Sequence, residues 1–333
     1  MSMRFKRLAG LGAALVVFLS GGQATAQQWD LGLCGDWEIG AHALYFTPIT
    51  CPYAYANRFT QFQVADIFDG QKGQAQVIPC RAEWGFRVFG NYLEDCFFAG
   101  VSYQWFEVTT TRSIVAVAPA SLVIQGGSLN GAGRATGQVG IEYQNVDVRA
   151  GKYFLKGCCS SLYLYGNVRW VDLSHRRTAR FATPNGVIFQ DVREKSQLEG
   201  GAIGIGFGVD SAIWCDFGAF IDGNILGVIG NRSVKDIRFR SRFAGSITET
   251  VQSYPSETCV IPEVDFRVGI NYTYACGCWQ MVGEIGYEVD YFWHGSVLPD
   301  LTGGILATGA REFVPVCEDL GFSGLFVGGR LIF

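Results

Sequence analysis

Charged residues and long hydrophobic runs are both scarce in this sequence. Charged side chains make up 17% of the chain, whereas a soluble domain usually carries about 25%. Beyond residue 26, no uninterrupted apolar stretch reaches the length of a transmembrane helix. The chain is nevertheless 49% hydrophobic and 14% aromatic, and its 44 glycines are more than helices tolerate. This combination predicts membrane strands in which lipid-facing residues alternate with polar ones.

Signatures of catalysis are also missing. The chain has 3 histidines and contains neither a G-x-S-x-G elbow nor an H-E-x-x-H motif. Gly204, Gly206 and Gly208 lie within a predicted strand and not at the strand-to-helix turn that a dinucleotide site needs. A net charge of −4 argues against a nucleic-acid partner. We therefore expect no enzyme activity, no cofactor and no catalytic residue.

The amino terminus has the features of a secretory signal. A basic start at residues 4–7 precedes the apolar run Leu8–Leu19, and Ala24-Thr25-Ala26 supplies a small-x-small cleavage site. Residues 1–26 are therefore predicted to be a signal peptide, and residues 27–333 a single domain. The alternative is a retained anchor, although the run is shorter than the about 20 residues that a spanning helix needs.

Ten segments alternate apolar and polar residues with period two, as half-buried strands do. The clearest, Val264–Tyr274, places Phe266 and Val268 on one face and Asp265 and Arg267 on the other. The ten segments are Trp37–Phe46, Glu83–Tyr92, Phe97–Glu107, Gln138–Lys152, Leu162–Leu173, Gly201–Ser211, Cys215–Ile229, Val264–Tyr274, Trp279–Trp293 and Leu320–Phe333.

One of these segments is irregular. In Gln138–Lys152 the apolar phase slips between Tyr143 and Val146. An extra residue in one strand of a pair produces such a slip, so the pattern predicts a β-bulge at this point.

The connections between the segments alternate in length. Short breaks lie at 93–96, 154–161, 212–214 and 275–278, and long ones at 47–82, 108–137, 174–200, 230–263 and 294–319. Tight periplasmic turns and long external loops produce this alternation in a membrane barrel, whereas a β-sandwich has no reason to show it. We predict an all-β, up-and-down antiparallel transmembrane barrel of ten strands with both termini on the periplasmic side. Twelve to sixteen strands stay open, because Arg58–Phe68 and Val115–Ile124 contain further β-like runs.

The carboxyl terminus is an alternating strand that ends on an aromatic residue. Leu325, Val327, Leu331 and Phe333 share one face. Outer-membrane barrels commonly end in this way, because the last strand must pair with the first to leave no free edge in lipid. Phe333 is therefore the expected signal for the barrel-assembly machinery, and outer-membrane lipid is the expected surrounding.

Several stretches resemble the major-outer-membrane-protein-like porins of chlamydia-related and legionella-type bacteria. The similar stretches are Trp84–Tyr92, Tyr143–Lys152, the pair Gly204–Ser211 and Gly218–Asn224, and Asp319–Leu325. They cover most predicted strands but not the external loops. The resemblance implies an abundant surface porin of the outer membrane that is often disulfide-linked to its neighbours.

Eleven cysteines are many for such a barrel. The predicted topology places Cys34, Cys96, Cys158, Cys159, Cys215, Cys276 and Cys278 on the periplasmic side, and Cys51, Cys80, Cys259 and Cys317 in external loops. Disulfides form in the oxidising compartment to which an exported chain travels. Because seven is odd, the periplasmic set cannot pair fully within one chain, so we predict a disulfide to a second copy or to another Cys-rich envelope protein. The alternative is a free buried thiol. A zinc site is not expected, since the Cys276 and Cys278 spacing is too short.

The polar faces of the strands carry the functional hypothesis. If the apolar faces meet lipid, charged residues of the opposite faces project into the lumen, where they tune ion preference. The expected pore-lining residues are Glu83, Arg87, Asp265, Arg267, Glu284, Glu288, Asp290 and Arg330. The sequence thus favours a porin for small hydrophilic solutes and ions, with glycines leaving room for water. Alternatively, these charges pair across a plugged interior, and the barrel is a structural envelope protein or an adhesin that displays its loops.

Overall fold

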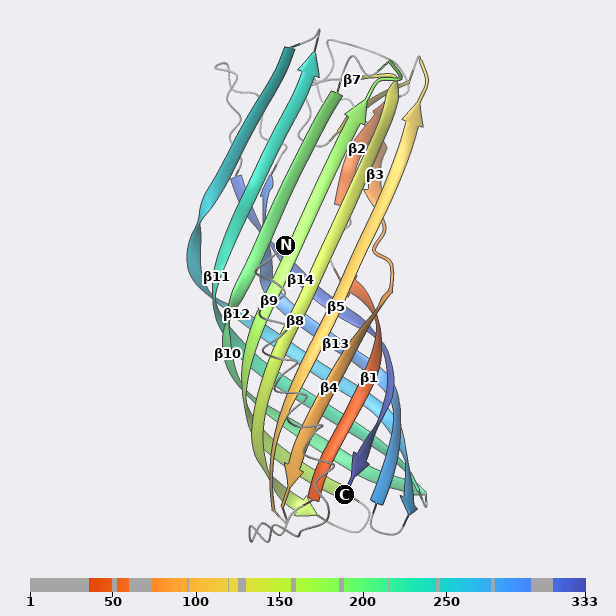
Figure 1. Ribbon diagram of the computed structural model, residues 1–333, viewed down its shortest axis with the longest axis vertical. Coiled ribbons are helices and arrows are strands. Elements are labelled where there is room, and N and C mark those ends of the chain that lie inside the picture. The colour runs from red at the N-terminus through yellow and green to blue at the C-terminus, as the bar shows by residue number, and fades with distance from the viewer. Residues whose placement is uncertain are drawn as a thin grey trace, which may run out of the picture. The chain divides into compact units, whose positions relative to one another are not determined.

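The structure, a computed structural model, describes residues 36–49, 53–59, 74–94, 96–118, 120–124, 130–156, 160–185, 189–214, 216–243, 246–276, 279–300 and 314–333. Ten strands of this part form a closed barrel, and four shorter strands form a separate sheet (Figure 1). The predicted signal peptide lies outside the described residues. Within the described residues, no helix is long and apolar enough to cross a bilayer.

The barrel is a continuous antiparallel ring. Its strands are β1 Asp36–Ile49, β4 Glu83–Leu93, β5 Phe97–Ala116, β8 Gly133–Lys156, β9 Ser160–Ala182, β10 Phe189–Trp214, β11 Phe217–Phe243, β12 Ser246–Cys276, β13 Trp279–Asp300 and β14 Val314–Ile332. They follow the order β1-β14-β13-β12-β11-β10-β9-β8-β5-β4, and β4 pairs with β1 to close the ring. The predicted fold and the ten-strand count are therefore confirmed.

The remaining strands do not widen the barrel. β2 Tyr53–Phe59, β3 Gln74–Ile78, β6 Ser121–Ile124 and β7 Asn130–Gly131 form a sheet in the order β3-β2-β6-β7. Of the two β-like runs, Val115–Ile124 supplies β6, whereas Arg58–Phe68 supplies only the end of β2 and otherwise lies outside the described residues. Tyr55 and Leu122 are fully buried. Figure 1 shows β2 and β3 at the barrel end opposite the carboxyl terminus.

The apolar faces point outward, as the alternation predicts. Ile203 and Ile205 of β10 are 67% and 74% exposed, as expected for side chains that face lipid. Aromatic pairs mark both rims of this band. The rings of Trp37 and Tyr92 lie 5.3 Å apart near the termini, and those of Tyr45 and Trp84 lie 4.9 Å apart at the other rim. Such pairs fit the aromatic girdles of membrane barrels.

The strands are longer than predicted. β12 has 31 residues and β11 has 27, whereas about 9–11 suffice to cross a bilayer. The segments 174–200 and 230–263, predicted as loops, are largely strand, and only residues 244–245 separate β11 from β12. Of the predicted loop 294–319, the described residues 294–300 and 314–319 are strand as well. The prediction was wrong here because the strands continue beyond the lipid, where outward residues such as Arg176 and Arg180 are polar and the apolar alternation ends.

The predicted bulge in β8 is also absent. β8 pairs in unbroken register with β5 and β9 through Tyr143 and Val146, and its register shift lies between Tyr153 and Leu155. Tyr143 faces the interior and is fully buried. The apolar phase changes at this point because the lumen changes from a polar to an apolar interior, while the backbone stays regular.

The last strand closes the barrel as expected. β14 pairs with β1 from Glu38 and Ile332 to Ile49 and Gly321. Beyond that register, Phe333 exchanges backbone hydrogen bonds of 2.8 and 2.9 Å with Trp37. The Phe333 ring stacks on Trp279 at 5.2 Å. The terminal residue thus joins the first strand to the last at the rim.

Candidate functional site: the barrel lumen

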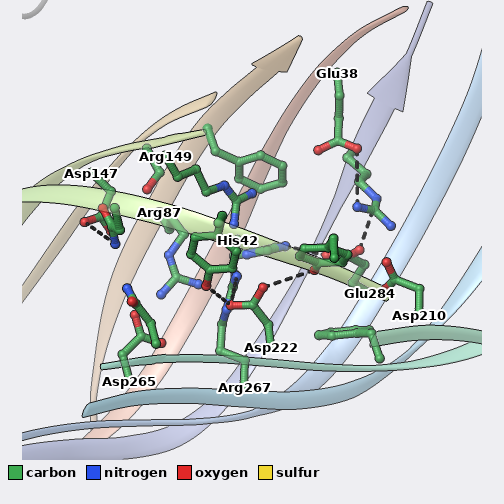
Figure 2. Close-up of a pocket in the computed structure, with 18 of the residues that line it drawn as sticks. Glu38, His42, Arg87, Asp147, Arg149, Asp210, Asp222, Asp265, Arg267 and Glu284 are labelled. Carbon is green, nitrogen blue, oxygen red and sulfur yellow. Dashed lines mark hydrogen bonds and ion pairs between the residues drawn. The ribbon is translucent and has the colours of Figure 1, made fainter. Parts of the chain in front are cut away.

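Charged side chains gather in the barrel lumen (Figure 2). They lie toward the termini, since Glu38 is near the start of β1 and Arg330 is near the end of β14. This lumen network comprises Glu38, His42, Arg87, Asp147, Arg149, Arg169, Asp210, Asp222, Glu263, Asp265, Arg267, Glu284, Glu288, Asp290 and Arg330. Each of these residues lies at an inward-facing position of its strand, where apolar outward residues alternate with polar inward ones. Nine are carboxylates and five are guanidinium groups, so the network carries a surplus of negative charge.

Three adjacent strands hold the first part of the network. His42 Nε2 of β1 lies 2.9 Å from Glu284 Oε2 of β13, and Arg330 Nε of β14 lies 3.1 Å from Glu284 Oε1. Arg330 Nη1 also donates to Glu38 Oε2 at 3.3 Å. Gly328 lies between His42 and Glu284 in the register, and a side chain there would overlap the His42 ring. This glycine therefore lets the histidine reach across β14.

Two further groups cross the lumen. Arg87 of β4 donates to Glu288 of β13 and, at 2.6 Å, to Gln104 of β5. Arg169 of β9 binds Glu263 of β12. The strands that carry each of these ion pairs are not neighbours in the barrel. Removing one partner of such a buried pair typically costs about 3–5 kcal/mol, because the other charge is left uncompensated.

Arg169 and Arg267 organise the carboxylates around them. Arg169 Nη2 donates to Asp147 Oδ2 at 2.9 Å and to Asp265 Oδ2 at 2.7 Å. Arg267 Nη2 donates to Asp222 Oδ1 at 3.0 Å. Asp222 also accepts hydrogen bonds from the hydroxyl groups of Tyr163 and Tyr165, at 3.1 and 2.9 Å.

The tyrosines occupy space that glycines leave on β10. A Cβ on Gly206 would overlap the Tyr165 ring, and one on Gly208 would overlap the Tyr163 ring. The expectation that inward glycines leave room for water was therefore wrong at these two positions, where aromatic rings fill it.

A cavity of about 70 Å³ remains within the network. One water needs roughly 10–15 Å³ on the same measure, so the cavity has room for several waters but not for a sugar-sized solute. Figure 2 shows Arg149, Asp222 and Glu284 among the side chains around it. The lumen is thus polar and narrow at this level.

An aromatic plug lies on the outer side of the network. It consists of Phe46, Phe106, Tyr143, Phe292 and Phe322, each 0% exposed. Their rings form a chain from β1 to β13, with centroids 5.8, 5.3, 5.0 and 5.6 Å apart in the order Phe46, Phe106, Phe322, Tyr143, Phe292. The plug therefore packs aromatic rings from five strands together across the lumen.

A second buried polar group, the outer cluster, lies beyond the plug and the lipid-facing band. Arg177 forms an ion pair with Glu318, and its Nη1 lies 3.8 Å from Glu194 Oε1. Its Cζ lies 4.8 Å from the centroid of the Tyr53 ring, as in a cation–π contact. Burial raises the pKa of the Glu194 carboxyl to about 7, Arg177 opposes this rise, and Glu318 adds to it. Burial, followed by the charge of Arg177, holds the pKa of His175 well below its usual 6.5.

Seven of the eight predicted pore-lining residues meet in the lumen network. Only Glu83 does not: it lies exposed at the start of β4. Sequence reasoning missed the other members, which are Glu38, His42, Asp147, Arg149, Arg169, Asp210, Asp222 and Glu263. Alternation was the signal that could have found them, because Asp147, for example, lies between the outward residues Val146 and Val148.

The cysteines are only partly described. Cys34, Cys51, Cys158, Cys159, Cys215 and Cys278 lie outside the described residues, and of Cys276 only the backbone is described. Cys259 and Cys317 lie within β12 and β14 and not in loops, which corrects their predicted places. Cys80 follows β3, and Cys96 carries an exposed free thiol at the turn between β4 and β5. The disulfides stay predictions.

Comparisons with known proteins identify the family. Residues 33–333 match the family model described as the Legionella pneumophila major outer membrane protein precursor. No curated protein matches the sequence significantly. Among solved structures, the chain is similar to the Escherichia coli outer membrane protease OmpT, at 9% identity and a TM-score of 0.43, covering 90% of this chain and 98% of that one.

Two other barrels show a weaker likeness. The attachment invasion locus protein Ail of Yersinia pestis has 9% identity and a TM-score of 0.24, with 90% of this chain and 99% of that one covered. A Pseudomonas aeruginosa FadL homologue has 6% identity and a TM-score of 0.27, with 90% of each chain covered. At such identities the likeness concerns the fold alone. The family match and the closed barrel together show that this chain is an outer-membrane β-barrel protein belonging to the Legionella pneumophila major outer membrane protein family.

Proposed function

We propose that this barrel is a narrow porin through which ions and small hydrophilic solutes diffuse passively, without a catalytic step. The observation that carries the proposal is the lumen network, in which charged side chains from around the barrel enclose a cavity of about 70 Å³. Charged groups in a membrane protein are costly unless they are paired or hydrated, and they mark ion pathways. A barrel that served only as a support could fill its interior with apolar side chains.

The charge balance of the network sets the expected ion preference. Its nine carboxylates exceed its five guanidinium groups. Asp210, on the cavity wall, accepts a hydrogen bond from Ser161 at 3.4 Å and has no ion pair with a described residue. Acidic groups lining a pore favour cations, so the proposed porin prefers cations.

The aromatic plug is the proposed gate. Hydrophobic constrictions close a pore by excluding water, and the five rings of the plug have no exposed surface. Passage therefore requires the plug to open. The small sheet is well placed to influence this step, because Tyr53 of β2 contacts the outer cluster through Arg177.

A structural envelope protein that displays its outer strands is the second candidate. The specific observation in its favour is that the five rings of the plug are completely buried and pack ring against ring across the lumen. Long strands beyond the lipid, such as the 31 residues of β12, would suit a display role.

Single-channel recording in planar bilayers separates the two candidates. The wild type is compared with Phe322→Ala, which removes a ring from the plug, and with the matched control Phe217→Ala, which removes a lipid-facing ring. We expect stepwise conductance from the wild type, more frequent or larger openings from F322A, and wild-type behaviour from F217A. Silence from folded wild type and folded F322A alike would favour the structural role.

A further inference from the structure

Three buried carboxylates of the lumen network lie together on neighbouring strands. Asp265 of β12 and Asp290 of β13 are directly opposite in the register, and Glu288 lies two residues from Asp290 on the same inward face. One carboxylate oxygen from each lies within 4.8 Å of the others. The three residues are 8%, 1% and 0% exposed, in the order Asp265, Asp290, Glu288.

The described protein groups leave this charge incompletely compensated. Like charges directly opposite each other on paired strands are destabilising, and burial strengthens their repulsion. Asp290 has no ion pair with a described residue, and Gln104 Nε2 donates to its Oδ2 at 3.2 Å. Three buried oxygens lack a hydrogen-bond donor: Asp265 Oδ1, Glu288 Oε2 and Asp290 Oδ1. Buried carboxylate oxygens without partners point to a bound group.

The other oxygen of each of these three carboxylates accepts a hydrogen bond from a described side chain. Arg169 binds Asp265, Arg87 binds Glu288, and Gln104 binds Asp290. Partners of this kind orient the ligands of a metal site. Arg169 is shared with Asp147 and Glu263, so two guanidinium groups serve five carboxylates. Arg267 adds a third positive charge close to Asp265 and Glu288, which still leaves the carboxylates in surplus. The surplus negative charge suits a divalent cation.

The carboxylate oxygens suit Ca²⁺ better than Mg²⁺, because Ca²⁺ accepts a wider and less regular set of oxygen ligands. Ca²⁺ binds oxygen ligands at about 2.3–2.6 Å, so two oxygens on one ion can be as much as about 5 Å apart. Mg²⁺ binds at about 2.0–2.1 Å, which limits that separation to about 4.2 Å. Oxygens that lie within 4.8 Å of one another come within the span of one Ca²⁺ ion, whose coordination is also more flexible than the octahedron that Mg²⁺ demands. Asp265 also lines the cavity in Figure 2, from which water can complete the coordination.

We infer that Asp265, Glu288 and Asp290 form a calcium-binding site in the wall of the barrel. The cation links β12 to β13 and, through Arg87, Arg169 and Gln104, to the opposite side of the lumen. The inference concerns a structural site and does not depend on conduction through the barrel.

Calcium titration of the purified, detergent-solubilised barrel tests this inference. After treatment with EDTA and its removal, the wild type is titrated with CaCl₂ by calorimetry, and its thermal unfolding is followed with and without Ca²⁺. We expect saturable binding and a higher Tm with Ca²⁺. Asp290→Asn should weaken binding about tenfold or more. Because Asp290 has no ion pair with a described residue, this substitution leaves no described charge without its partner. In EDTA, D290N should unfold no lower than the wild type, because the substitution removes repulsion.

Matched controls separate this site from surface binding. Glu257 is an outer carboxylate with 60% side-chain exposure, and Glu257→Gln should bind Ca²⁺ as the wild type does. Asp265→Asn provides a second site variant, with the same loss expected. If the wild type shows no saturable binding, or if the folded D290N and D265N variants bind Ca²⁺ like the wild type, the assignment is overturned.

Discussion

At the scale of single residues, Glu194 shows how burial outside the lipid band sets a pH response. Burial raises its pKa from 4.5 to about 7, with Arg177 only partly opposing the shift. A carboxyl with a raised pKa in the folded state binds its proton more tightly there than in the unfolded chain. Its contribution therefore favours folding below about pH 4.5 and is lost as the pH rises from about 4.5 to 7.

We expect Glu194→Gln to remove this pH dependence. A shift of this size corresponds to roughly 3 kcal/mol, at about 1.36 kcal/mol per pKa unit. Urea unfolding in detergent, measured between pH 4.5 and 8, should show a midpoint that falls with pH for the wild type and changes less for E194Q. The exposed acid Glu249 provides the control, since Glu249→Gln should keep the wild-type slope. Equal slopes for wild type and E194Q would contradict the role assigned to burial.

At the scale of elements, β10 depends on small inward residues. A methyl group on Gly208 would overlap the Tyr163 ring, whereas nothing lies within 4 Å of a methyl group on Gly227 of β11. We expect Gly208→Ala to lower the free energy of unfolding by about 1–3 kcal/mol, as overpacking does, and Gly227→Ala to change it little. Denaturant unfolding of both variants measures the difference, and similar values for the two would count against the packing described for β10.

The strands were predictable from sequence only where they face lipid. Val264–Tyr274 lies within β12 because lipid requires an apolar residue at every second position there. The same strand begins at Ser246, and its outer half was read as a loop, since outward residues beyond the lipid can be polar. The phase slip in β8 was read as a bulge for a related reason: Tyr143 faces an apolar interior that alternation alone does not reveal.

At the scale of the whole barrel, closure and inward charge were predictable, but the contents of the lumen were not. Strand number and terminal pairing follow from alternation and the short turns. Which charges meet depends on register across strands far apart in the chain, such as Arg169 on β9 with Glu263 on β12. The aromatic plug was missed because its five rings come from five different strands, and no local pattern connects them.

Cross-linking between barrels is a prediction at this scale. Cys96 is exposed, with a free thiol, at the turn between β4 and β5, on the side of the termini. Because the periplasm is oxidising, such a thiol is available to a neighbouring chain. Non-reducing gels of native envelopes should show higher-mass species that collapse on reduction and weaken in Cys96→Ser. Monomer alone in the wild type would refute inter-chain disulfides.

The ion preference of the channel is the most direct test of the central claim, that the charged lumen is a conduction path. The reversal potential is measured across a planar bilayer that separates two KCl concentrations. Asp210→Asn removes one charge from the cavity wall, and Asp172→Asn, on the outward face of β9, is the control. We predict cation preference for the wild type, a weaker preference for D210N, and no change for D172N. Anion preference, or a reversal potential unaffected by D210N, would contradict the account.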